Sequence, residues 1–270
     1  MRRAPMRIIR GLRREFVAAI YDLFSRLMPQ SEEQLAEDST DVWEHRDGDD
    51  TALVSGSHWL NQGGGWTDTV WREYGESHLE MLKDGLRLAG RTSPIRSVVD
   101  WGSGGGSNAA AIAPTVDRYF GVDISDSNLG ECMRQAQALG LNNFEPILIP
   151  AAYPEDVLQQ MDHSISAVDF FLCTAVYQHL PGRSYARRVT DIAMRLLADD
   201  GIALINIRYS NLKRQNRNWR RSYKKHATHF NHYTVWEFQK EMEELGMDVM
   251  EIRMQPLTHH AYFFLRKFRS

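Results

Sequence analysis

Cysteine is scarce in this chain of 270 residues, which contains two, Cys132 and Cys173. Neither stands at the short spacing from another cysteine that zinc sites and redox motifs require. With two cysteines the chain cannot form a disulfide framework, and their spacing matches no metal-ligand pattern. So few cysteines are typical of a reducing, cytoplasmic setting. The sequence also lacks an apolar run of about eighteen residues, so we expect no membrane-spanning helix.

An excess of charge of one sign is lacking as well. The 32 Lys and Arg residues nearly balance the 35 Asp and Glu residues, which leaves a net charge of −3. Such a chain has no general attraction to nucleic acid. With 43% hydrophobic residues, it can form one domain of ordinary size with an extension. Function must therefore be sought in local motifs.

Residues 1–94 show two opposite patterns of charge. In residues 1–30, arginines are interleaved with apolar residues at helical spacing, which predicts a basic amphipathic helix. This helix could pack on the protein's own core, join two copies in a homodimer, or make peripheral contact with an anionic membrane. Residues 31–50 are acidic and predict a solvated linker. We expect residues 31–94 to form this linker and a helical lid or cap.

Residues 55–71 place aromatic side chains beside a triple glycine, Gly63–Gly65. The composition fits a loop that closes over a ligand, and equally a glycine-rich connector with half-buried tryptophans. From Val70 to Ala89 apolar residues recur at helical spacing, and Gly90 follows as a stop signal. A helix is expected there.

The most informative segment is an apolar run that ends in Asp100 and leads into Gly102, Gly104 and Gly106. An alanine-rich stretch follows, which predicts a strand, a tight turn and a helix N-terminus. Because glycine lets the backbone approach a ligand closely, the turn indicates a nucleotide-type pocket. Ser107 departs from the dinucleotide fingerprint, and an acid at the strand end disfavours a pyrophosphate.

A second strand is expected from Arg118 to Asp123, which makes a β-α-β unit. The carboxylate of Asp123 either accepts the hydroxyls of a ribose or caps the next helix, a role equally open to Ser125 and Asp126. A third strand is expected over Phe144–Ile149.

The fourth expected strand is led by Asp169, ends at Cys173 and Thr174, and precedes a His-Leu-Pro turn at 179–181. Open α/β sheets bind ligands at the carboxyl ends of their strands, so this end should lie beside the glycine turn. Further strands are expected at 202–207, 248–254 and 262–266. Thr234 and Glu237 predict a capping box at the start of a late helix.

Together, the glycine turn, the acid-led fourth strand and the Tyr-Thr-x-x-Glu-Phe segment at 233–238 resemble class I S-adenosylmethionine-dependent methyltransferases. The resemblance assigns residues 95–270 to the S-adenosylmethionine-binding methyltransferase domain. It implies an α/β, Rossmann-like fold: a seven-stranded, mostly parallel sheet with helices on both faces, here with an N-terminal helical extension. The implied cofactor is S-adenosyl-L-methionine, with S-adenosyl-L-homocysteine as product.

The resemblance also implies a set of cofactor-binding residues. The expected residues are Asp100, Gly102, Gly104, Gly106, Asp123, Ile124, Ala151, Cys173 and Thr174. Related methyltransferases often carry an acid that contacts the adenine where this chain has Ala151, so backbone groups are expected to replace it.

An oxygen or nitrogen acceptor benefits from a base, and histidine suits neutral pH. The candidates are His179 and His232, followed by His229, His226 and His58. For His179 the alternative is a turn that shapes a helix start. The histidines at 226, 229 and 232 could line a helix face or bind metal; without a fourth ligand we expect a solvent-facing or substrate-facing loop and no metal.

Lys and Arg residues crowd the segment 213–225. It could bind phosphates of nucleic acid or of a phosphorylated or lipid-linked acceptor, or be a charged surface loop. No RNA-binding module is evident, so we expect methyl transfer to an oxygen or nitrogen of a small or lipid-linked molecule. The alternatives are an RNA or protein methyltransferase that uses this basic segment, and a binding protein that keeps the fold without the reaction.

Overall fold

The computed structural model describes residues 27–44, 56–61, 65–161, 167–210 and 222–268, together with Ile20 and Leu23. Most of the predicted basic helix of residues 1–30 therefore lies outside the described residues. The same holds for the basic segment up to residue 221.

Within the described ranges, seven strands form one sheet in the order β3-β2-β1-β4-β5-β7-β6. The strands are β1 (Ser97–Trp101), β2 (Arg118–Asp123), β3 (Phe144–Leu148), β4 (Val168–Cys173), β5 (Leu197–Arg208), β6 (Met247–Gln255) and β7 (His260–Lys267). Neighbours from β3 to β5 run parallel, and β7 runs antiparallel to both β5 and β6. This is the Rossmann-like sheet predicted from the sequence.

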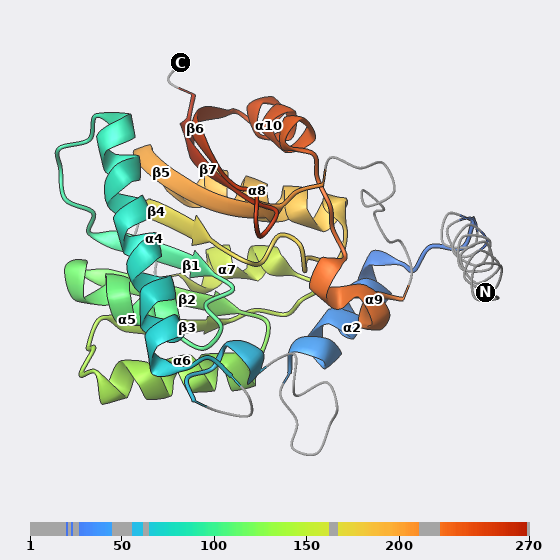
Figure 1. Ribbon diagram of the computed structural model, residues 1–270, viewed down its shortest axis with the longest axis horizontal. Helices are drawn as coiled ribbons and strands as arrows, with labels where there is room; N and C mark the ends of the chain where they lie inside the picture. Colours follow the sequence, from blue (N-terminus) through green and yellow to red (C-terminus); the bar gives the residue numbers. More distant parts are fainter. Residues whose placement is uncertain are drawn as a thin grey trace, which may run out of the picture.

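Helices cover both faces of this sheet (Figure 1). The α-helices are α2 (Glu32–Trp43), α4 (Asp68–Ala89), α5 (Ser107–Ile112), α6 (Asp126–Ala138), α7 (Val157–Gln160), α8 (Arg183–Leu196), α9 (Tyr223–His226) and α10 (Val235–Glu244). Short 3-10 helices are η1 (Gly56–His58), η2 (Ala113–Thr115), η3 (Pro154–Asp156) and η4 (Ala227–His229). Helices α4, α5 and α6 pack on one face, and α8 and α10 pack on the other. Among the described residues, no helix combines the length and the apolar character that crossing a bilayer requires.

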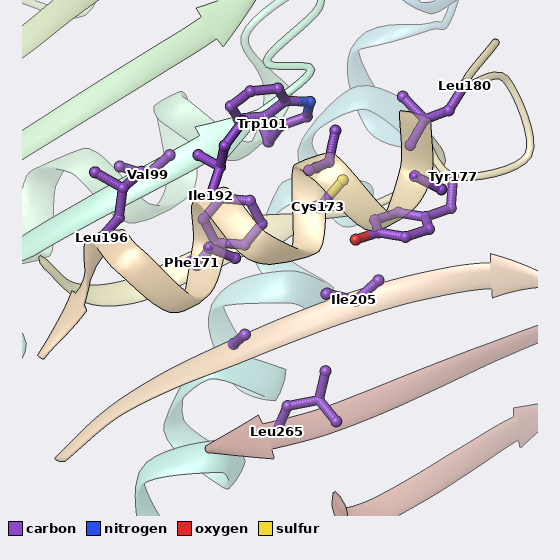
Figure 2. Packing of buried hydrophobic residues seen from close by; sticks show 14 of the residues in the cluster. Val99, Trp101, Phe171, Cys173, Tyr177, Leu180, Ile192, Leu196, Ile205 and Leu265 are labelled. Carbon is purple, nitrogen blue, oxygen red and sulfur yellow. The ribbon is translucent and has the colours of Figure 1, made fainter. Parts of the chain in front are cut away.

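Alternation along the central strands builds a core on each face. In β1, Val99 points into the cluster that includes α8, while Val98 points into the cluster that includes α4 and α5. Figure 2 shows the first of these cores, where Phe171 and Cys173 of β4 lie near Ile192 of α8. Side chains of a strand alternate between faces, so a strand covered on both faces is buried along its length and is mostly apolar. Every residue of β1 is accordingly buried.

The predicted start of α10 and the predicted end of α4 are both confirmed. The hydroxyl of Thr234 accepts a hydrogen bond from the Glu237 N–H at 3.1 Å, and the Glu237 carboxylate accepts one from the Thr234 N–H at 2.9 Å. These two bonds form the predicted capping box of α10. Helix α4 ends at Gly90, whose φ of 64° is the left-handed conformation that glycine adopts readily.

The prediction of a solvated linker was wrong over Glu32–Trp43, where the structure has helix α2. Its start is a capping box of Ser31 and Gln34, and its buried residues include Leu35 and Val42. These apolar residues form a small separate core with residues of α9 and η4. The acidic residues occupy the outer face, which hides the helical spacing of the buried ones. The division of the chain into domains stays a prediction.

Candidate active site

A cavity of about 300 Å³ lies at the carboxyl edge of the parallel strands. Its floor is formed by residues that follow β1, β2 and β4, the position at which open α/β sheets bind ligands. Side chains from outside the sheet cover it, among them Trp43, His58, Trp66, Tyr74 and Tyr223. Figure 1 shows α2 and α9 beside one another beyond these strand ends.

The turn after β1 has a backbone conformation that explains why glycine stands at every second position. Gly102, Gly104 and Gly106 have φ angles of 76°, 51° and 83°, all in the left-handed region that other residues rarely occupy. A Cβ atom on Gly102 would lie 2.4 Å from a methyl carbon of Val176. The Gly102 N–H donates to the carbonyl of Val122 at 2.7 Å, which holds the turn against β2.

Asp123, at the end of β2, joins this turn to the next helix. Its carboxylate accepts hydrogen bonds from the N–H groups of Gly104 and Ser125, both at 3.0 Å. The hydroxyl of Ser125 caps α6 by accepting from the Asn128 N–H at 3.1 Å, so Asp123 is not the side-chain cap. Burial raises the pKa of Asp123 to about 6, although these backbone donors and Asn128 act to lower it. The carboxylate lines the cavity.

Asp100 lies behind the cavity wall, where it organises a buried polar network. It accepts hydrogen bonds from the Tyr119 hydroxyl at 2.7 Å and from the Asn108 amide at 3.4 Å. Asn108 lines the cavity and also contacts the imidazole of His78 at 2.8 Å. Burial raises the pKa of Asp100 to about 7. Asp100 is thus placed to act on a ligand through Asn108.

An aromatic wall closes the side of the cavity under α2 and α9. The Trp43 indole N–H donates a hydrogen bond to the Tyr223 hydroxyl at 2.9 Å, and that hydroxyl donates to the backbone carbonyl of His179. The rings of Trp43 and His179 lie 4.7 Å apart. Glu44, just after α2, accepts a hydrogen bond from the Ser127 N–H at 3.2 Å, which ties α2 to the start of α6.

His179 has a defined orientation within this wall. Its Nδ1–H donates to the carbonyl of Ala227 at 2.9 Å, so Nε2 carries the lone pair and accepts from the Gln178 amide at 3.2 Å. Burial lowers the pKa of His179 to about 4. The ring is therefore neutral at pH 7 and can take up a proton at Nε2.

The fold and this site find a counterpart among known proteins. Residues 71–252 match the family model described as a methyltransferase domain. The chain belongs to this methyltransferase family. It is an S-adenosylmethionine-dependent methyltransferase of class I, as the resemblance implied.

Individual relatives of this methyltransferase are distant. A tRNA (guanine-N(7)-)-methyltransferase of Sodalis glossinidius (strain morsitans) is 27% identical over 106 residues, which are 38% of this chain and 43% of that protein. The chain thus matches less than half of that curated relative.

Two solved structures share the fold. An S-adenosylmethionine-dependent methyltransferase from Clostridium acetobutylicum ATCC 824 has a TM-score of 0.55 and 11% identity, over 74% of this chain and 92% of that one. PKMT2 from Rickettsia typhi has a TM-score of 0.54 and 13% identity, over 72% of this chain and 53% of that one.

The residues of the cavity fit S-adenosylmethionine. The Asp123 carboxylate reaches the cavity at the end of β2, where it can accept hydrogen bonds from the ribose hydroxyls, and Gly102 and Gly104 line the same end. The imidazole Nε2 of His58 also lines this cavity and is buried without a hydrogen-bond partner among the described residues. When bound, the cofactor supplies a methyl group on a positively charged sulfur, activated for in-line displacement.

The structure brings part of the predicted site together at the cavity. The predicted residues that line it are His58, Gly102, Gly104, Asp123, Ile124, Thr174 and His179. Those that do not are Asp100, Gly106, Ala151, Cys173, His226, His229 and His232. Cys173 is a buried core residue on the α8 face, and a Cβ on Gly106 would meet Cys132 at 3.1 Å. The His232 backbone carbonyl accepts from Arg183.

Sequence reasoning missed two of the aromatic residues that cover the cavity, Trp43 and Tyr223, whereas Trp66 comes from the segment 55–71 that was expected as a possible ligand cover. Trp43 stands in the acidic segment and Tyr223 in the basic one, so charge obscured both. A signal for Trp43 existed, because it continues the helical spacing of Leu35 and Val42. Nothing local marks Tyr223, because its role depends on contacts with α2.

Proposed function

We propose that this methyltransferase moves a methyl group to an oxygen or nitrogen of a small molecule with an apolar or aromatic body. The observation that supports this most is the wall of Trp43, Tyr223 and His179, which closes the cavity with aromatic surface. Small ligands are commonly held in such concave, mostly apolar sites with a few polar groups that fix their orientation.

The charge of the lining supports the same choice. Among the described residues, neither Lys nor Arg lines the cavity. Burial lowers the pKa of both His58 and His179 to about 4, so neither imidazole is a cation at pH 7. A nucleic acid owes most of its affinity to contacts between phosphates and cationic side chains. In the described part of the basic segment, Lys224 is paired with Asp38 and Asp41 of α2.

We assign the proton acceptor to His179 rather than to His232, which does not line the cavity. The Nδ1–H bond to Ala227 fixes the ring so that Nε2 is the accepting atom, which the Gln178 amide occupies in this structure. A pKa of about 4 makes His179 a weak base. Weak basicity suffices here, because the proton of a hydroxyl or amine becomes strongly acidic as the atom gains a methyl group. The acceptor, once bound at the wall, replaces Gln178 as the donor to Nε2.

The membrane-linked part of the expectation rests on residues 1–30, which lie mostly outside the described residues. We keep a lipid-linked acceptor as a variant of the same proposal, because an apolar wall also suits a lipid tail. A cytoplasmic location is proposed on the grounds that both cysteines are free and buried.

One comparison favours a second candidate, methylation of tRNA, which is the substrate in the name of the Sodalis relative.

The proposal is tested by measuring S-adenosylhomocysteine release with a panel of phenols and aromatic amines, with the same compounds on lipid carriers, and with bulk tRNA. We expect turnover with a small aromatic acceptor, and a raised KM for it in Trp43→Ala. The matched control is Trp236→Ala, because Trp236 is exposed on α10. Turnover with tRNA alone, weakened by salt, would replace our proposal with the second candidate.

A further inference from the structure

A short segment between α2 and α4 lies directly on the glycine turn. We call residues 56–61 with 65–66 the lid segment. Its two arms are joined by a bridge between Leu60 and Trp66 and by a hydrogen bond from the Asn61 N–H to the Trp66 carbonyl at 2.9 Å. Trp59 is buried, and its indole N–H donates to Asn128 at 2.9 Å. The lid segment is therefore anchored to α6, next to Asp123.

The glycine turn is shaped to receive this segment. A Cβ on Gly104 would lie 2.6 Å from Nε2 of His58, and a Cβ on Gly105 would lie 2.9 Å from Cδ1 of Trp59. Neither distance is compatible with normal packing. Gly102 faces Val176 instead. The turn thus serves two purposes, because it forms the cavity floor and leaves room for the lid segment.

The imidazole of His58 in the lid segment has a buried nitrogen that lacks a hydrogen-bond partner among the described residues. Its Nε2 is buried and lines the cavity, yet no described residue forms a hydrogen bond with it. A buried polar atom without a partner destabilises a protein, so such atoms are normally satisfied. Burial lowers the pKa of His58 to about 4, against the opposite effect of Glu131. The ring is neutral at pH 7 and can donate at Nε2.

The geometry points to His58 as a cofactor-binding residue: its Nε2 forms a hydrogen bond with an oxygen of bound S-adenosylmethionine, which fastens the lid segment over the methyl donor. The cofactor is favoured over the acceptor because His58 rests on Gly104, whose N–H donates to Asp123. The base His179 stands instead at the aromatic wall with Trp43. This assignment does not depend on which acceptor the enzyme uses.

Calorimetric titration of the full-length protein with S-adenosylmethionine and S-adenosylhomocysteine tests the assignment. We expect His58→Leu, which cannot form a hydrogen bond, to weaken both affinities about tenfold, as the loss of one such bond predicts. His58→Gln places an amide near the position of Nε2 and should stay within about threefold of wild type. His260→Leu is the control, because His260 is half-buried and does not line the cavity.

Hydrogen exchange of the lid segment supplies a second readout. Bound S-adenosylhomocysteine should slow exchange of the 56–61 backbone in wild type and in His58→Gln, and much less in His58→Leu. Unchanged affinity in a folded His58→Leu protein overturns the assignment. Equal losses in the Leu and Gln variants also overturn it, because they would show a need for the ring and not for the hydrogen bond. A loss of kcat with unchanged cofactor affinity would place His58 on the acceptor, against our assignment.

Discussion

The indole N–H of Trp43 donates a hydrogen bond to the hydroxyl of Tyr223 at 2.9 Å, although the two residues are 180 positions apart in the chain. The bond joins α2, which precedes the catalytic sheet, to α9, which follows β5. Because Tyr223 also bonds the backbone of His179, it connects this two-helix cover to the proposed base. The acceptor side of the cavity therefore depends on segments outside the common sheet.

Tyr223→Phe removes this connection while it keeps the ring. The Trp43 N–H loses its partner, so we expect the free energy of unfolding to fall by about 1–3 kcal/mol. The acceptor KM should rise with the affinity for S-adenosylmethionine unchanged. Denaturant unfolding and steady-state kinetics measure the two effects. Tyr153→Phe, at a side chain that is 61% exposed, should change neither. Wild-type stability in Tyr223→Phe would contradict the role given to this bond.

Gly104→Ala should disturb both the turn and the lid segment. The left-handed backbone strains any side chain, and the new Cβ would lie 2.6 Å from His58 Nε2. We expect cofactor affinity to fall at least tenfold and the free energy of unfolding to drop by about 1–3 kcal/mol. Gly130→Ala is the matched control in α6, where a Cβ meets no atom within 4 Å. Equal cofactor affinity and equal free energy of unfolding in the two variants would contradict the close packing of the lid segment on Gly104.

Cofactor affinity should depend on pH through Asp123. Its pKa is raised to about 6, so the carboxylate is mostly ionised at pH 7 and mostly protonated at pH 5. An ionised carboxylate accepts more hydrogen bonds from ribose hydroxyls. Affinity should therefore weaken about tenfold from pH 7 to pH 5. In Asp123→Asn it should be low at both values. A pH-independent affinity in the wild type would remove Asp123 from the ribose contact.

Stability should depend on pH in the opposite sense through Asp100. Burial raises its pKa to about 7, above the value of about 3.9 in an unfolded chain. Between these values the folded protein holds a proton that the unfolded chain releases, so the free energy of unfolding decreases as pH rises from about 4 to 7. Asp123 contributes in the same direction. Urea titrations of wild type and Asp100→Asn measure this, and the variant should show the flatter profile.

His179→Gln tests the proposed base. We expect kcat to fall about a hundredfold or more, the usual contribution of general base catalysis, with cofactor affinity unchanged. His232→Gln should retain most activity, because His232 does not line the cavity. The reverse pattern in the two variants would transfer the role to His232.

Local patterns sufficed to predict the strands of the sheet and the glycine turn that lines the cavity. Apolar strands that end in Asp100 and Asp123, and glycines at alternate positions between them, depend on residues that are close in sequence. Gly102 and Gly104 have left-handed φ angles, a conformation that glycine adopts readily, which explains the glycines at alternate positions. Strand geometry alone then brings Thr174 to the same edge.

The part of the cavity cover that α2 and α9 supply could not be predicted in this way, because its contacts are long-range. Acidic composition suggested a linker where α2 forms, since Lys224 neutralises Asp38 and Asp41 only in the folded chain. The strand-end acid Asp100 was expected to bind the cofactor directly, yet in the structure Asn108 lines the cavity and donates a hydrogen bond to Asp100, which does not line it. Contacts of this kind form only when segments that are distant in sequence pack together.

A crystal structure of the protein with S-adenosylhomocysteine tests the central claim most directly. We expect the ribose hydroxyls on Asp123, a cofactor oxygen within hydrogen-bond distance of His58 Nε2, and the sulfur directed at the space before Trp43, Tyr223 and His179. A cofactor whose sulfur faces away from this wall would contradict the account, because no acceptor bound there could then receive the methyl group.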